Sequence, residues 1–138
     1  MNDDRILWNE RCDFAQKTLS ALFRDEKKGW MKQGVPSENP SNQNFCYWWH
    51  AHAIDALLDG YLRTGDKDYC NRIEQVLQGV LAQNGGGILN TYYDDMEWMA
   101  LALLRVWECT QKDEYKNLVL SLWEDIKTGW NDNMGGGI

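Results

Sequence analysis

Residues 46–82, CYWWHAHAIDALLDGYLRTGDKDYCNRIEQVLQGVLA, contain the pattern that decides the fold. Residues 46–63 carry apolar side chains on nearly every side of a helix, which is typical of a helix buried all round. After the turn Thr64-Gly65-Asp66, residues 67–82 carry one apolar stripe against polar residues, which is typical of a helix with one face in solvent. The stretch therefore predicts a helical hairpin with one buried and one amphipathic helix.

This hairpin pattern recurs further along the chain. Residues 94–109 are again apolar on nearly all sides, and residues 115–127 again carry a single stripe. The segment from Thr64 to Tyr69 aligns with that from Thr110 to Tyr115 at a spacing of 46 residues, and Gly-Gly-Gly-Ile occurs at 85–88 and again, 50 residues later, at 135–138. A period of this length with two helices per repeat indicates stacked helical hairpins.

The remaining segments fit the same plan. Residues 3–23 predict an amphipathic helix, and residues 27–43, which contain both prolines, predict a long loop. The connections from an amphipathic helix to the next buried one, at 27–43, 83–93 and from 128 onward, are long and rich in glycine and aromatic residues. Because the helices alternate in direction, these loops lie at one end of the stack, where we expect function.

The predicted fold class is all-α, built from tandem helical hairpins. If the stack closes, the buried helices form an inner ring and the amphipathic helices an outer one. We expect residues 1–138 to form a single domain, and we find five helices in it. The sequence stops where a sixth helix should begin, which would leave an inner face uncovered, so we expect the N-terminal portion of a longer domain.

Composition and charge exclude several functional classes. The chain has 14 basic and 21 acidic residues and a net charge of −7, which disfavours nucleic-acid binding. The sequence shows neither a signal-peptide core near its start nor an apolar run long enough to span a membrane, so a soluble, cytoplasmic protein without membrane contact is expected. Its four cysteines are dispersed and form no CxxC pair, so neither a zinc site nor a disulfide framework is expected.

The candidate chemistry lies in residues 92–98, Tyr-Tyr-Asp-Asp-Met-Glu-Trp, at the head of the second buried helix. One interpretation is structural, because Asp94 as N-cap with Glu97 three residues later is a capping-box pattern. The other is catalytic. Two adjacent carboxylates at the head of an apolar helix repel each other, so the pKa of one rises and it can donate a proton while its neighbour stays ionised. Such a pair suits glycoside cleavage, with retention at a separation of about 5 Å and inversion at a wider one.

On these residues the sequence resembles glycoside hydrolase family 76, the endo-acting α-1,6-mannanases and related enzymes built on an (α/α)6 toroid. The resemblance rests on Tyr-Tyr-Asp-Asp-Met at 92–96, Trp-Met-Ala-Leu-Ala at 98–102, and Gly-Trp-Asn-Asp at 129–132 before the second glycine triplet. It implies that the chain is the first five helices, about two-fifths, of a toroidal catalytic domain. It also implies that Asp94 is the nucleophile and Asp95 the acid/base of a retaining double displacement, with no metal or organic cofactor.

The resemblance further implies an oligosaccharide or polysaccharide substrate of the mannan type. Members of the family are often secreted, and the missing export signal favours imported oligosaccharides.

Other candidates for substrate contacts lie at the same end of the stack. Trp48 and Trp49 align with Asp94 and Asp95 at the repeat spacing, and each fits either a sugar platform or core packing. His50 and His52 are further candidates at the same helix head. They lie two residues apart, so the two rings point to nearly opposite sides of a helix, and no zinc pair is expected.

Three more candidates flank the aspartates. Tyr92 and Tyr93 fit hydrogen bonding to a carboxylate or a sugar hydroxyl, and equally loop packing. Asp132, in the next long loop, fits either sugar binding or the start of an Asx turn.

Three functions remain open from the sequence. The leading hypothesis is a glycosidase of carbohydrate metabolism acting on α-mannosidic linkages, with α-1,6 expected. A transglycosidase of the same family would share every residue named above. A noncatalytic helical-repeat carbohydrate-binding protein, in which the aspartates merely cap a helix, is the third. The sequence does not predict an oligomeric state.

Overall fold

The computed structural model describes residues 2–138, with side chains from residue 4 onward. Within this range the chain forms five α-helices and no β-strand, which confirms the predicted all-α fold class. The α-helices are α1 (Asn2–Thr18), α2 (Tyr47–Thr64), α3 (Asp68–Gln83), α4 (Tyr93–Thr110) and α5 (Asp113–Ile126). A π-helical turn, Leu19–Phe23, continues α1, and short 3-10 turns occupy Pro40–Gln43, Lys127–Gly129 and Asn133–Gly135.

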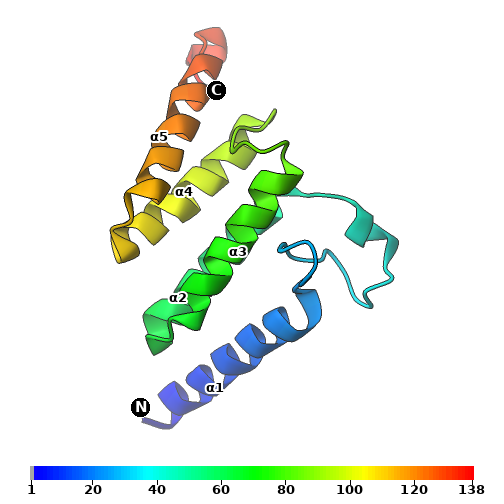
Figure 1. Cartoon of the computed structure of the whole chain (residues 1–138). Helices are drawn as coiled ribbons and strands as arrows, with labels where there is room; N and C mark the ends of the chain where they lie inside the picture. Colours follow the sequence, from blue (N-terminus) through cyan, green and yellow to red (C-terminus); the bar gives the residue numbers. More distant parts are fainter. Residues whose placement is uncertain (1) are drawn as a thin grey trace.

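The connections alternate in length as the repeat predicts. Two or three residues join α2 to α3 and α4 to α5, whereas long loops follow α1, α3 and α5. Gly65 ends α2 with a φ of 71°, and Gln111, 46 residues later, ends α4 with a φ of 56°. Both are left-handed C-caps whose N–H bonds back to the last helical turn. In Figure 1 the long loops lie at the end of the molecule opposite the N-terminus.

The core lies between the two hairpins. α2 and α4 pack against each other, α3 covers α2, and α5 covers α4 (Figure 1). Fully buried side chains from these four helices include Ile54, Leu58, Ile73, Val80, Met96, Met99, Leu103, Leu122 and Ile126. Buried apolar area is the main stabilising contribution in such a stack.

The expectation that α2 and α4 are buried all round is wrong for the described chain. Each buries the face turned towards its neighbours and leaves another face open, on which Trp48, Trp98, Leu101 and Leu104 are 36–54% exposed. The physical reason is the set of contacts, since within residues 2–138 α4 packs mainly against α2 and α5. An apolar pattern identifies the layer of a helix but not which of its sides is covered.

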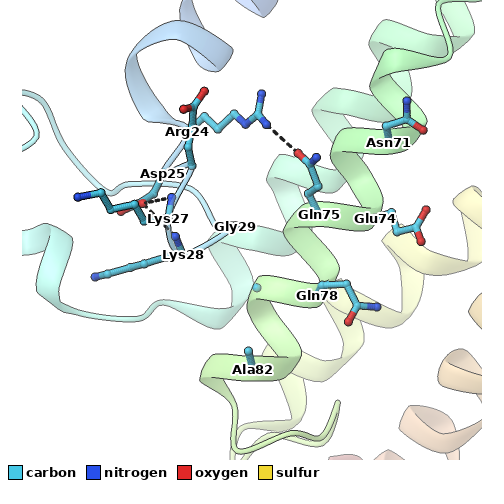
Figure 2. A pocket seen from close by; sticks show the side chains of 12 residues that line it. Arg24, Asp25, Lys27, Lys28, Gly29, Asn71, Glu74, Gln75, Gln78 and Ala82 are labelled. Atoms are coloured by element: carbon cyan, nitrogen blue, oxygen red, sulfur yellow. Dashed lines mark hydrogen bonds between the residues drawn. The ribbon is translucent and has the colours of Figure 1, made fainter.

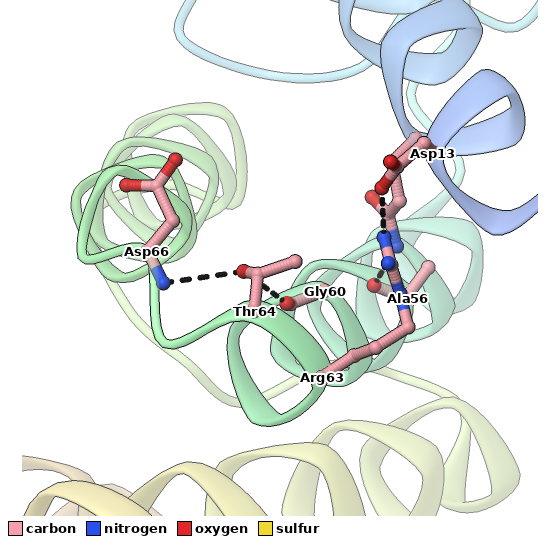
Figure 3. A network of polar contacts seen from close by, with 7 residues as sticks. Asp13, Ala56, Gly60, Arg63, Thr64 and Asp66 are labelled. Carbon is pink, nitrogen blue, oxygen red and sulfur yellow. Dashed lines mark hydrogen bonds and ion pairs between the residues drawn. The ribbon is translucent and has the colours of Figure 1, made fainter. Parts of the chain in front are cut away.

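Helix α1 is held to α2 by polar contacts (Figure 3). Arg63 of α2 forms an ion pair with Asp13, and the side-chain amide of Gln16 donates to the carbonyl of Ala56. The apolar side chains of Trp8 and Phe14 are 59% and 73% exposed. Helix α1 is therefore the least embedded helix of the five. Within residues 2–138 no helix is long and apolar enough to cross a membrane.

The long loop between α1 and α2 is fixed by a buried aromatic cluster. Trp30 is 3% exposed and stacks on Phe45 at 5.4 Å and on His50 at 5.7 Å between ring centroids. At Gly79 of α3 the backbone of this loop passes so close that a Cβ atom would lie 2.8 Å from the carbonyl carbon of Gly29. The loop thus packs against the head of α2 through Trp30 and against α3 at Gly79.

Candidate active site

Asp94 and Asp95 lie in the first turn of α4, at the end of the stack that carries the long loops. The helix begins at Tyr93, so its N-cap is Tyr92, and no side-chain cap bond forms. The turn before it is held instead by Asn90, whose Oδ1 accepts the Tyr92 N–H at 3.0 Å. The interpretation of Asp94 as the N-cap of a capping box is therefore wrong, because the helix begins before it.

The two carboxylates occupy different environments. Asp94 is exposed, whereas Asp95 is half-buried, and burial followed by the charge of Asp94 raises the pKa of Asp95. Within residues 4–138 neither carboxylate accepts a hydrogen bond or forms an ion pair. A carboxyl group with a raised pKa can hold and donate a proton while a neighbouring carboxylate stays ionised.

Asp95 also faces the head of α2. Its negative charge adds to the effect of burial in raising the pKa of both Cys46 and Tyr47. Tyr47 is 2% exposed and donates its hydroxyl to the Ile88 carbonyl at 2.6 Å. This buried hydrogen bond ties the head of α2 to the loop that leads into the aspartates.

The residues that flank the aspartates differ in exposure. Tyr92 is 66% exposed, while Tyr93 is half-buried and its hydroxyl lies 3.5 Å from Thr128 Oγ1. Gly129 adjoins the Tyr93 ring, and a Cβ there would lie 2.6 Å from it. Asp132 is exposed in the loop after α5, which is closed by backbone hydrogen bonds between Asn131 and Gly137. The loop thus lies beside the head of α4.

The aromatic candidates on α2 separate into two groups. Trp48 and Trp49 are 40% and 43% exposed and meet edge to face at 5.8 Å. His50 is 1% exposed; its Nδ1 lies 2.7 Å from the Cys46 carbonyl and its Nε2 accepts the Met31 N–H at 3.2 Å. Burial lowers the pKa of His50. Both ring nitrogens of His50 are thus engaged by backbone groups of the protein.

Near the aspartates, Trp98 was not among the sequence candidates for substrate contact, and it packs against the candidate His52. His52 packs on Trp98 with ring centroids 4.9 Å apart and on Trp48 at 5.5 Å. Trp98 lies one turn below Asp94 and is 46% exposed. The repeat could have identified the pair, because His52 and Trp98 are themselves 46 residues apart.

Two hollows are lined by residues other than the aspartates. One, of about 350 Å³, opens between the π-helical turn and α2 and is lined by apolar side chains together with Trp48, Trp49 and His52. The other, of about 620 Å³, lies between residues 24–29 and α3 (Figure 2). There the Asp25 carboxylate is engaged by the N–H groups of Lys27 and Lys28. Across residues 4–138 no group of three or more His, Cys, Asp or Glu side chains is arranged to hold a metal ion.

The chain is similar to a family of known enzymes and to several solved structures. The model of glycosyl hydrolase family 76 matches residues 8–138. The GH76A α-1,6-mannanase from Salegentibacter sp. HEL1_6 is 39% identical with a TM-score of 0.86. An inactive variant of that enzyme, replaced at two consecutive aspartates and in complex with α-1,6-mannotriose, gives 37% identity and a TM-score of 0.87. A protein from Listeria innocua is 38% identical to the chain, with a TM-score of 0.84. No curated protein matches the chain significantly.

These structures are longer than the present chain. The matches cover 95% of the chain but 37% of the Salegentibacter enzyme and 39% of the Listeria protein. The match to the family model extends over nearly the whole sequence, and the structural likeness is found at more than a third identity. The chain therefore belongs to glycosyl hydrolase family 76, as its sequence motifs predict.

Proposed function

We propose that the protein hydrolyses α-1,6-mannosidic linkages by a retaining double displacement at Asp94 and Asp95. The observation that carries the proposal is the unequal environment of these two carboxyl groups. Asp95 is half-buried with a raised pKa, while Asp94 is exposed beside it. A general acid must hold its proton near the working pH, and a nucleophile must be ionised.

The assignment of roles follows from this asymmetry. An oxygen of Asp94 attacks the anomeric carbon, and the bond from that carbon to the leaving oxygen breaks as Asp95 transfers its proton to that oxygen. Water then gives a proton to Asp95 and attacks the glycosyl ester, which releases the Asp94 carboxylate and a sugar with its original anomeric configuration. No step requires a metal or an organic cofactor.

A structural relative supports the choice of residues and substrate. The Salegentibacter enzyme is inactive when two consecutive aspartates are replaced by asparagine, and that variant is seen with α-1,6-mannotriose. A variant with alanine at the same two positions is seen with α-1,6-mannotetrose. Within residues 8–138, the range that matches the family, Asp94 and Asp95 are the sole pair of consecutive aspartates.

Further side chains at the loop end are proposed to contact the sugar chain. Trp48, Trp49 and Tyr92 expose aromatic surface, and Asp132 exposes a carboxylate. Aromatic faces stack on the apolar faces of sugars, and carboxylates accept hydrogen bonds from hydroxyl groups. Tyr93 is proposed to orient the first turn of α4, because its ring adjoins Gly129.

The test is hydrolysis of α-1,6-mannooligosaccharides by the complete protein, with wild type compared with Asp94→Asn and Asp95→Asn. Both variants should lose cleavage while keeping the wild-type circular dichroism spectrum. On an aryl mannoside, whose leaving group needs little protonation, Asp95→Asn should keep far more of the first step than Asp94→Asn. NMR of the first product formed should show retention.

Three results would change the proposal. A folded wild type that cleaves no α-1,6-mannoside would overturn the substrate, and binding without cleavage would favour the noncatalytic alternative. An inverted first product would exclude the double displacement. Transfer to an added acceptor sugar in preference to water would identify a transglycosidase.

A further inference from the structure

The two inner helices present matching stripes to each other. On α2 the stripe contains Trp48, His52, Asp55 and Asp59, whose spacing of three to four residues places them on one side of the helix. On α4 the positions 46 residues later are Asp94, Trp98, Leu101 and Arg105. The sequence repeat thus becomes a pair of facing side-chain rows.

These rows form layers below the aspartates. The first layer is aromatic: the His52 ring centroid lies 4.9 Å from that of Trp98 and 5.5 Å from that of Trp48. Below it, the guanidinium of Arg105 pairs with Asp55 at 2.5 Å and with Asp59 at 2.6 Å. The ionic layer joins α2 to α4 and holds the aromatic layer in register.

We propose that His52 and Trp98 form the floor of the sugar-binding site directly beneath the catalytic carboxylates. The inference rests on the proposed function. Trp98 follows Asp94 by four residues, which is about 6 Å along a helix and close to the width of one sugar ring. Helical side chains lean towards the N-terminus, so the indole is directed back towards Asp94. Within residues 4–138 the Trp98 side chain is 46% exposed.

His52 contributes a polar group to the same floor. Unlike His50, it forms no hydrogen bond with the protein within residues 4–138. A neutral imidazole has one N–H donor and one acceptor nitrogen, which suits a sugar hydroxyl. Trp48 packs edge-on against the His52 ring and fixes its plane. The floor thus combines a stacking surface with a hydrogen-bonding edge.

The experiment measures binding without hydrolysis. In the complete protein carrying Asp94→Asn and Asp95→Asn, the dissociation constant for α-1,6-mannotriose is measured by calorimetry, alone and with Trp98→Ala or His52→Ala added. The matched control is Trp123→Ala, because Trp123 is 51% exposed but lies on the outer helix α5. Each floor variant should weaken binding at least tenfold, as for other aromatic stacking platforms, and the control less than twofold.

Conservative variants separate binding from packing. Trp98→Phe and His52→Gln should each restore part of the affinity, because they keep a ring face and a hydrogen-bonding group. Binding within twofold of the parent in both alanine variants, with a lowered melting temperature, would show that the pair only packs and would overturn the floor. Absence of mannotriose binding by the folded parent, together with no hydrolysis by the wild type, would overturn the proposed function itself.

Discussion

Tyr47→Phe tests how the head of α2 fixes the loop before the aspartates. The substitution removes one oxygen and with it the 2.6 Å hydrogen bond to the Ile88 carbonyl. Tyr47 is 2% and Ile88 6% exposed, so water replaces the lost donor poorly. A net hydrogen bond contributes about 1 kcal/mol, and leaving a buried carbonyl without a donor costs about 1–3 kcal/mol. We expect the free energy of unfolding to fall by about 2 kcal/mol, which is roughly 30-fold in the unfolding equilibrium constant.

The assay is urea denaturation of the complete protein, with midpoint and slope compared between variants. The matched control is Tyr115→Phe: Tyr115 is 3% exposed, and its phenol forms no hydrogen bond within residues 4–138. The free energy of unfolding of Tyr115→Phe should fall by less than about 0.5 kcal/mol. Hydrolysis by Tyr47→Phe should also fall, because Ile88 belongs to the loop that leads into α4. Equal losses in the two variants would refute the role of this hydrogen bond.

Three further outcomes are expected. Because the pKa of Asp95 is raised in the folded state, its ionised form opposes folding above that pKa. Asp95→Asn should therefore have a higher melting temperature than wild type at pH 7. This difference in melting temperature should shrink as the pH falls towards 4. Gly129→Ala places a Cβ 2.6 Å from the Tyr93 ring, so the ring must move by about 1 Å and kcat should fall about tenfold or more. The control is Gly137→Ala, which has open space around the new Cβ and should leave kcat unchanged. Arg105→Gln should cost about 0.5–1 kcal/mol in urea melts, and less in high salt.

The helices themselves could be predicted from the sequence because burial imposes a period on it. The expected segments 46–63 and 94–109 correspond to α2 (Tyr47–Thr64) and α4 (Tyr93–Thr110). The amphipathic stripes likewise predicted α3 and α5. Periodicity reports which side chains avoid water, and this signal is strong wherever a helix packs along its whole length.

Other features could not be read from the pattern, because they depend on where the neighbouring segments lie. The capping-box interpretation was wrong, since the N-cap of α4 is Tyr92, two residues before Asp94, and Asn90 holds the preceding turn. His50 and His52 lie two residues apart on the same helix, yet His50 is buried beneath the α1–α2 loop and His52 is only half-buried. The difference depends on Met31, whose N–H reaches His50 from a distant segment.

The repeat explains why the site has its composition. Equivalent positions at the heads of α2 and α4 carry Trp48 and Trp49 in one hairpin and Asp94 and Asp95 in the next. Both pairs lie at the end of the stack that carries the long loops, because short and long connections alternate along the chain. The stack therefore places aromatic and acidic helix heads side by side, and packing between α2 and α4 fixes their relative height. In the proposed function this combination has a use, since aromatic faces would orient the sugar ring while the carboxylates act on its anomeric carbon.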